Sequence, residues 1–132
     1  MTEDVKKELL EIVDRIAQIN GEMDEIQNEQ TKIRDKIMVM RAEIVIDIGT
    51  AKDETGKPLY SNQKLRDAAL TLKLADHQEF QELVETRRAL SDKLRALAIE
   101  HNRLVDRKEI LMIEMGSLPS SDDAQRLNRR YL

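Results

Sequence analysis

Apolar residues recur along the first part of the chain at alternating steps of four and three. The positions in this series are Val5, Leu9, Ile12, Ile16, Ile19, Met23, Ile26, Gln30, Ile33, Ile37, Met40 and Ile44. A series with this spacing, broken by a polar side chain only at Gln30, is typical of a coiled-coil helix. We therefore predict a helix over residues 3–48, about 65–70 Å long, which a compact domain of this size cannot enclose.

A second periodic segment occupies the later part of the chain. Its leucines recur every seven residues, at Leu83, Leu90, Leu97, Leu104 and Leu111. Polar residues, among them Arg87, His101 and Lys108, share the same face, so the apolar stripe is wide and mixed. This pattern predicts a helix over residues 77–115 and favours a bundle of three or four helices over a strict two-stranded coil.

The segment between these helices contains turn-forming residues. Gly49 is expected to end the first helix in the left-handed conformation, and Gly56 with Pro58 marks a linker over 49–60. A short helix over 61–75 follows, with Ser61 as its N-cap and Leu65, Ala68, Ala69 and Leu72 on one face.

The start of the last helix has two interpretations. Asp76 with Glu79 has capping-box spacing, which favours a separate helix, but one kinked helix over 61–115 fits the pattern equally well. Gly116 and Pro119 end this part of the chain. Residues 116–132 form a C-terminal tail that is either disordered or a short helix, because Ser120 and Asp123 again have capping-box spacing.

The predicted architecture is all-α: a long antiparallel helical hairpin with a short intervening helix, assembling into a dimeric helical bundle. Residues 38–48 and 110–115 are apolar nearly all round the helix. The short helix is expected to cover the first stretch, whereas the second, at the open end of the hairpin, has little cover. Side chains left in water forfeit about 1.5–3 kcal/mol each, which favours self-association, and dimers dominate among oligomers.

The residues expected at the oligomer interface belong to the two apolar series. They are Leu9, Ile12, Ile16, Ile19, Ile26, Ile33, Ile37, Leu97, Leu104, Leu111 and Met115. Gln30 is interpreted as the residue that specifies register, because a polar group within an apolar seam disfavours other alignments. Arg87 and Lys108 are interpreted as long side chains that extend from the edge of the seam into water.

The composition supports long helices and limits the chemistry. Hydrophobic residues make up 40% of the chain and charged residues 36%, but aromatic residues only 2%, with no cysteine. This balance is typical of coiled coils, and it excludes disulfides, thiolate metal ligands and thiol nucleophiles. Neither a signal peptide nor an apolar run near the roughly 20 residues of a membrane span is apparent, so we expect a cytoplasmic protein without membrane contact.

Two groups of residues suggest catalytic or binding chemistry, but neither has the pattern that such chemistry requires. Thr55-Gly56-Lys57 lacks the first glycine and the final hydroxyl residue of a phosphate-binding loop, so a turn is the better interpretation. His77 and His101 have no companion ligands at metal-binding spacing. We therefore expect no catalytic residues, no cofactor and no metal, and predict that the protein is not an enzyme.

Charge suggests a nucleic-acid partner as the alternative. Residues 1–49 carry seven basic against twelve acidic side chains, a net of −5, whereas residues 50–75 carry five against three, a net of +2. Nucleic acid would therefore contact the linker region or the basic tail. The candidate contacts are Lys52, Lys57, Lys64, Arg66, Arg126, Arg129 and Arg130.

The linker sequence Lys-Asp-Glu-Thr-Gly-Lys-Pro-Leu-Tyr-Ser-Asn, residues 52–62, resembles a segment of small coiled-coil proteins encoded by bacteriophages and other bacterial mobile elements. Their E-Y-Q-E-L motif is similar to residues 79–83, with Phe80 in place of tyrosine. The resemblance covers residues 50–85 and implies a phage or prophage setting in the bacterial cytoplasm. The expected function is a non-enzymatic, homo-oligomeric interaction or scaffolding protein with an unidentified protein partner. The alternative is a nucleic-acid-associated accessory in phage recombination or host-nuclease inhibition.

Overall fold

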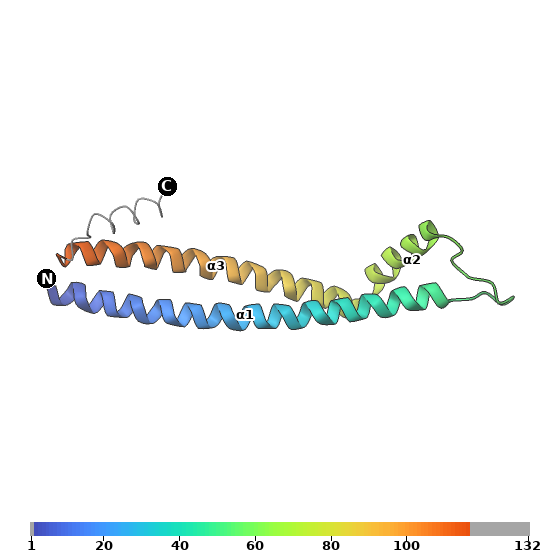
Figure 1. Ribbon diagram of the computed structural model, residues 1–132, viewed down its shortest axis with the longest axis horizontal. Helices are drawn as coiled ribbons and strands as arrows, with labels where there is room; N and C mark the ends of the chain where they lie inside the picture. Colours follow the sequence, from blue (N-terminus) through green and yellow to red (C-terminus); the bar gives the residue numbers. More distant parts are fainter. Residues whose placement is uncertain (1, 117–132) are drawn as a thin grey trace. The chain divides into compact units, whose positions relative to one another are not determined.

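The computed structural model describes residues 2–116, with side chains from Glu3 onward, and confirms the all-α prediction. Its three helices are α1 (Thr2–Thr50), α2 (Gln63–Asp76) and α3 (Gln78–Glu114), labelled in Figure 1. The predicted ranges, 3–48, 61–75 and 77–115, differ from these bounds by at most two residues at either end. The alternative left open for residues 61–115 is resolved in favour of two helices, which are separated at His77.

The chain divides into two compact units, and α1 and α3 both pass through them. Within the described residues, unit 1 comprises residues 2–24 and 95–116, and unit 2 comprises residues 25–94. In the described part of unit 1, α1 and α3 run antiparallel and side by side (Figure 1). Their buried side chains are Ile12, Ile19, Leu97, Val105 and Leu111.

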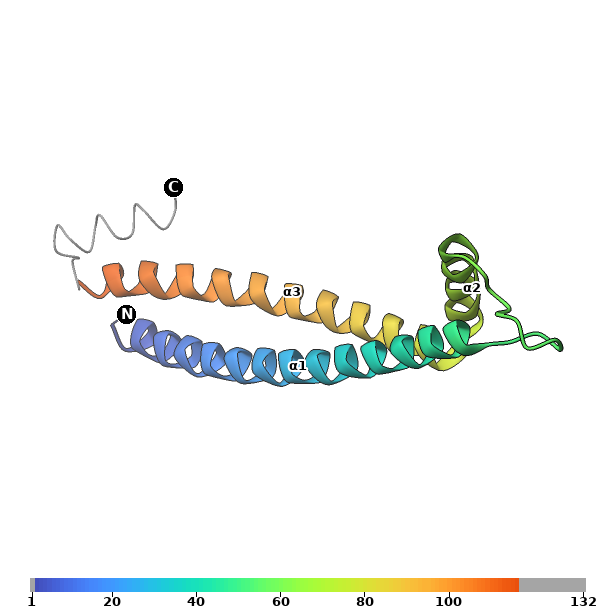
Figure 2. The ribbon, with the colours of Figure 1, turned by 45° about the vertical axis from the view of Figure 1, so that its right-hand side comes forward.

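Unit 2 contains the second half of α1, the linker, α2 and the start of α3. Its buried side chains are Ile26, Ile33, Ile48 and Ala69. The C-terminal end of α2 lies near α1 and its N-terminal end points away from it (Figure 2). As a result α2 buries little of its own apolar surface, and Leu65 and Leu72 remain 47% and 66% exposed. Among the four residues expected on its inner face, only Ala69 is buried.

The end of α1 differs from the sequence prediction. Gly49 lies inside the helix with a negative φ, so it is not the left-handed cap that we expected. Ile48 is only 3% exposed and anchors the last turn, while the Thr50 hydroxyl donates a hydrogen bond of 2.8 Å to the Ile46 carbonyl oxygen. Because burial and this bond stabilise the last turn, the helix continues through Gly49, where glycine costs only about 1 kcal/mol relative to alanine.

The N-caps of α2 and α3 each lie one residue later than predicted. Asn62, not Ser61, caps α2: its side-chain oxygen accepts a hydrogen bond from the Leu65 amide at 2.9 Å. His77, not Asp76, caps α3: its Nδ1 accepts from the Phe80 amide at 3.0 Å. Serine and aspartate, the two predicted cap types, can both cap a helix. The path of the backbone therefore decides whether the predicted residue or its neighbour becomes the cap.

The loop between α1 and α2 is organised around one carboxylate. Asp53 Oδ1 accepts hydrogen bonds from the Thr55 amide, the Thr55 hydroxyl and the Lys57 amide, at 2.9, 2.7 and 3.0 Å. Gly56 has a φ of +82°, a conformation that glycine adopts most readily. The turn interpretation of Thr55-Gly56-Lys57 is therefore confirmed. The hydrogen bonds, that from the Thr55 hydroxyl above all, hold the pKa of the Asp53 carboxyl below its ordinary value.

Candidate interaction surfaces

The residues expected at an oligomer interface lie inside the single chain. Six of the eleven are buried: Ile12, Ile19, Ile26, Ile33, Leu97 and Leu111. The remaining five are half-buried: Leu9, Ile16, Ile37, Leu104 and Met115. The two apolar series therefore supply the contacts between α1 and α3 within each unit. The expectation that these residues contact a second copy stays a prediction, and the exposed apolar side chains offer further surface for such a contact.

In unit 2, α1 carries a second apolar face. Ile33 is 6% exposed and belongs to the buried seam, whereas Ala42, nine residues or two and a half turns later, points to the opposite side. Around Ala42 lie Met38, Val39, Val45 and Ile46, which are 62%, 57%, 46% and 63% exposed. We call Met38, Val39, Ala42, Val45 and Ile46 the outer stripe.

The outer stripe corrects the expectation that the short helix covers residues 38–48. In Figure 2, α2 approaches α1 only with its C-terminal end. The side chains of the outer stripe therefore remain exposed to water. The sequence already contained the relevant signal, since a stretch that is apolar all round needs two partners. The apolar pattern alone did not tell which of the two faces would stay uncovered.

In unit 1, the two sides of the helix pair differ in chemistry. On one side Arg15 Nε donates to Glu100 Oε1 at 2.8 Å, and one heptad earlier on α1, Arg107 Nε donates to Glu8 Oε1 at 3.1 Å. The Arg15 hydrogen bond holds the pKa of the Glu100 carboxyl below its ordinary value. Both pairs are partly solvated, so they determine the register of the two helices more than they stabilise them.

The other side of this helix pair carries several apolar side chains, together with Lys6 and Lys108. At about 100° per residue, Arg15 lies about 60° to one side of Ile12 and Val13 about 100° to the other. On α3, Arg107 and Met112 flank Leu111 in the same way. The side opposite the ion pairs therefore carries Leu10, Val13, Val105 and Met112, which are 57%, 45%, 7% and 42% exposed. We call these four residues the open flank.

Gln30 forms a side-chain hydrogen bond between α1 and α3. Its Nε2 donates to the Ser91 hydroxyl at 2.8 Å, and its side chain is half-buried. Arg87, which also lies on this face of α3, is exposed to water. A shallow polar hollow surrounds this bond, lined by Gln27, Gln30, Thr31, Arg34, Arg87 and Ser91. A polar pair at one point of an apolar seam is suited to a role in register, although its effect on oligomer choice stays a prediction.

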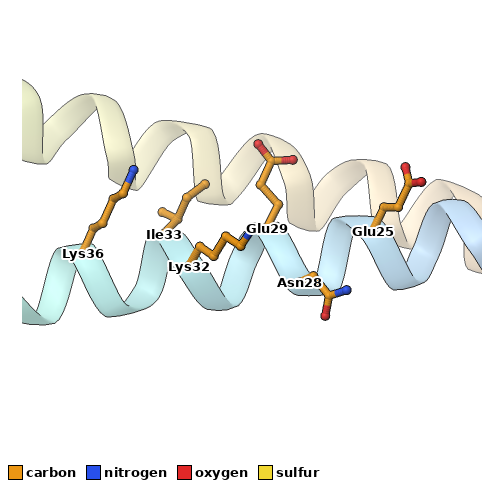
Figure 3. Close-up of a pocket in the computed structure, with 6 residues that line it drawn as sticks. All are labelled: Glu25, Asn28, Glu29, Lys32, Ile33 and Lys36. Carbon is orange, nitrogen blue, oxygen red and sulfur yellow. The ribbon is translucent and has the colours of Figure 1, made fainter.

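A second hollow lies on unit 2 along a single face of α1 (Figure 3). It is lined by Glu25, Asn28, Glu29, Lys32, Ile33 and Lys36. Ile33 forms its buried floor, and the five polar side chains around it are exposed to solvent. Positive and negative side chains both line the hollow, and all of them are strongly hydrated. The hollow therefore neither encloses an apolar ligand nor presents the uniform charge that would attract a ligand of opposite charge.

The basic residues of the linker region have two different environments. Lys52, Lys57 and Lys64 are exposed, whereas Arg66 is half-buried and donates to the Tyr60 carbonyl oxygen at 3.2 Å. Arg66 therefore helps to fix the loop against α2, which leaves the three lysines as the accessible cations of this group. Arg126, Arg129 and Arg130 lie outside the described residues.

Within residues 2–116 no group of three metal-ligating side chains is close enough together to hold an ion, and no helix is long and apolar enough to cross a membrane. Comparison of the chain with protein-family models, with curated proteins and with solved structures found no match.

Proposed function

We propose that this protein is a non-enzymatic interaction module that self-associates through the outer stripe of α1. The observation that supports the proposal is an apolar face opposite the buried seam. Four large side chains there keep about half or more of their surface in water. Covering a side chain of this kind contributes up to about 1.5–3 kcal/mol, so burying several at once is enough to drive association.

A second copy of the chain fits this face because the stripe is symmetric about Ala42. Val39 and Val45 lie three residues to either side of it, and Met38 and Ile46 lie four residues to either side. Two copies of α1 packed antiparallel across a two-fold axis at Ala42 would therefore match Met38 of one with Ile46 of the other. A self-complementary patch of this kind is what a two-fold interface requires, and alanine at its centre allows close approach of the helices.

The test is the sedimentation behaviour of the full chain at micromolar concentration. We expect a dimer for the native protein and a monomer for Ile46→Asp. A two-fold interface would bury the new carboxylate twice, and a cost of about 1.4 kcal/mol for each copy weakens dimerisation about a hundredfold. The matched control is Ile99→Asp, which replaces an isoleucine that is 49% exposed and lies outside the stripe.

Three results would contradict the proposal: a native chain that is monomeric at micromolar concentration, an unchanged dimer for Ile46→Asp, or equal dissociation of both variants. A heteromeric scaffolding role, and the phage setting implied by the linker resemblance, extend this proposal. A dimer that buries only the outer stripe of α1 in each copy leaves α2 and the linker accessible to a protein partner.

The second candidate is a nucleic-acid-associated accessory, favoured by the exposure of Lys52, Lys57 and Lys64 on and beside the loop. Gel shifts with single- and double-stranded DNA over a range of salt concentrations test it. Binding that weakens with salt and is lost when these lysines are replaced by glutamine supports the candidate. Absence of binding at low salt contradicts it.

A further inference from the structure

The polar hollow around the Gln30–Ser91 hydrogen bond brings two arginines together. Arg34 lies four residues after Gln30 on α1, and Arg87 lies four residues before Ser91 on α3. The two helices run antiparallel in unit 2 (Figure 1), so the bond of 2.8 Å places both arginines at the same level. Both line the hollow. Two guanidinium groups that line one hollow repel each other, and an anion between them offsets the repulsion.

The groups around the hollow are suited to a phosphate. None of its six lining residues is acidic. Ser91 Oγ accepts a hydrogen bond from Gln30, so its own O–H is available as a donor. Within residues 3–116, no hydrogen bond or ion pair holds the Arg87 guanidinium. The arginines and the hydroxyl therefore supply donors, and the oxygens of a phosphodiester are acceptors.

The nearest acidic residues do not cancel this charge. Asp35 Oδ1 lies 3.6 Å from Arg34 Nη2, but the Arg34 side chain remains 53% exposed. Leu90 and Asp92 lie about 100° to either side of Ser91 around α3. Leu90 is half-buried and Asp92 is exposed, so Asp92 points away from α1. The hollow itself is therefore basic.

Two further exposed arginines extend the basic surface beyond the hollow. Arg41 lies two turns after Arg34 on the same face of α1, about 10 Å away. Arg88 follows Arg87 on α3. Glu85 lies about 160° from Arg87 around α3, on the far side of that helix. A free phosphate ion contacts only the hollow. A nucleic-acid strand, with a phosphate about every 3.4 Å along its axis, also reaches Arg41 and Arg88.

We propose that this hollow binds a backbone phosphate of a single-stranded nucleic acid, between Arg34 and Arg87 and beside the Ser91 hydroxyl. The proposal rests on the second candidate function, and it names a binding surface other than the exposed lysines. It also gives a role to Gln30 and Arg87, the polar residues that interrupt the two apolar series within the same hollow. Contacts to phosphate oxygens carry no base preference, so binding is independent of nucleotide sequence.

Fluorescence anisotropy of the full chain with a labelled thymidine oligonucleotide of about ten nucleotides tests the proposal. The test variant combines Arg34→Gln with Arg87→Gln. The matched control combines Lys32→Gln with Lys36→Gln, which removes the same charge from exposed side chains of α1 that line the other hollow. At low salt we expect binding to weaken at least about tenfold in the test variant and less than about twofold in the control. The slope of the logarithm of the binding constant against the logarithm of salt concentration should fall by about 1–2 in the test variant alone.

Each outcome of this experiment decides the proposal. Equal weakening in the test and control variants reports a general attraction to a polyanion and overturns it. Binding that is lost on replacement of Lys52, Lys57 and Lys64 by glutamine but survives in the arginine variant also overturns it, while the second candidate function stands. Absence of binding to the native chain at low salt contradicts both.

A titration with inorganic phosphate, followed by NMR of the arginine side chains, provides an independent measurement. The Nε–H resonances of Arg34 and Arg87 should shift. Those of Arg15 and Arg107, which already donate to carboxylates, should not. Equal shifts at all of these arginines overturn the site. The oligonucleotide should bind at least about tenfold more tightly than inorganic phosphate, because it engages several arginines at once. Equal affinities refute nucleic acid as the source of the phosphate.

Discussion

Ile19 provides the most direct test of how the chain is held together. Its side chain is completely buried between α1 and α3 in unit 1. Replacement by alanine removes three carbon groups, which at about 0.8 kcal/mol each amounts to about 2.4 kcal/mol. The cavity left behind adds to this loss, so we expect Ile19→Ala to lower the free energy of unfolding by about 2–5 kcal/mol.

Ile99→Ala is the matched control because it makes the same chemical change in the same unit. Ile99 is 49% exposed, so about half of the transfer free energy, about 1.2 kcal/mol, is the most that this substitution can cost. Urea unfolding followed by far-UV circular dichroism measures both variants. All samples need the same protein concentration, because self-association makes the apparent stability concentration-dependent. Equal losses in the two variants would refute the argument that the heptad isoleucines stabilise the chain through burial.

Three further predictions concern the ends of helices, the loop and the polar seam pair. Gly49→Ala is expected to raise the free energy of unfolding by about 0.4–1 kcal/mol, because Gly49 is helical with open space around it, whereas Gly56→Ala lowers it by about 1–2 kcal/mol because its φ is positive. Thermal unfolding distinguishes these signs, and destabilisation by Gly49→Ala would contradict the observed helix end. The loop contribution of Asp53 is fully present above the ordinary aspartate pKa and is lost as the pH falls through its lowered folded value. An NMR titration of the Thr55 and Lys57 amides should therefore show one acid transition, absent in Asp53→Asn. Gln30→Leu is expected to raise the melting temperature and to broaden the oligomer distribution in light scattering, and a single unchanged oligomer would count against a register role.

The heptad pattern was sufficient to predict the helices. Apolar spacing predicted an all-α fold and located α1 and α3, because a side chain's position around a helix follows directly from its number, whereas turn and capping residues located α2. The same spacing identified Ile19 and Leu111, the two fully buried large side chains. The pattern did not tell whether a seam residue meets its own chain or a second copy, because both partners present the same apolar surface. Six of the eleven expected interface residues are accordingly buried within the chain.

Helix ends and uncovered faces were harder to predict. Ser61 and Asn62 are both good caps, and only the backbone path selected Asn62. His77 is not a residue type that preference rules favour as a cap, so its role could not be expected. The exposure of Met38 and Ile46 depends on the direction in which α2 leaves α1. That direction depends on the loop between α1 and α2 and on the interruption between α2 and α3 at His77. Neither feature is marked by a periodic pattern of apolar residues in the sequence.

The loop between α1 and α2 has a practical consequence. Its hydrogen bonds join Ala51 to Leu59, Asp53 to Gly56, and Asp53 to Thr55 and Lys57, all within nine consecutive residues. No contribution from α3 appears among them. The segment should consequently keep its conformation when grafted between the helices of an unrelated hairpin, as a portable connector whose exposed lysines can carry a label.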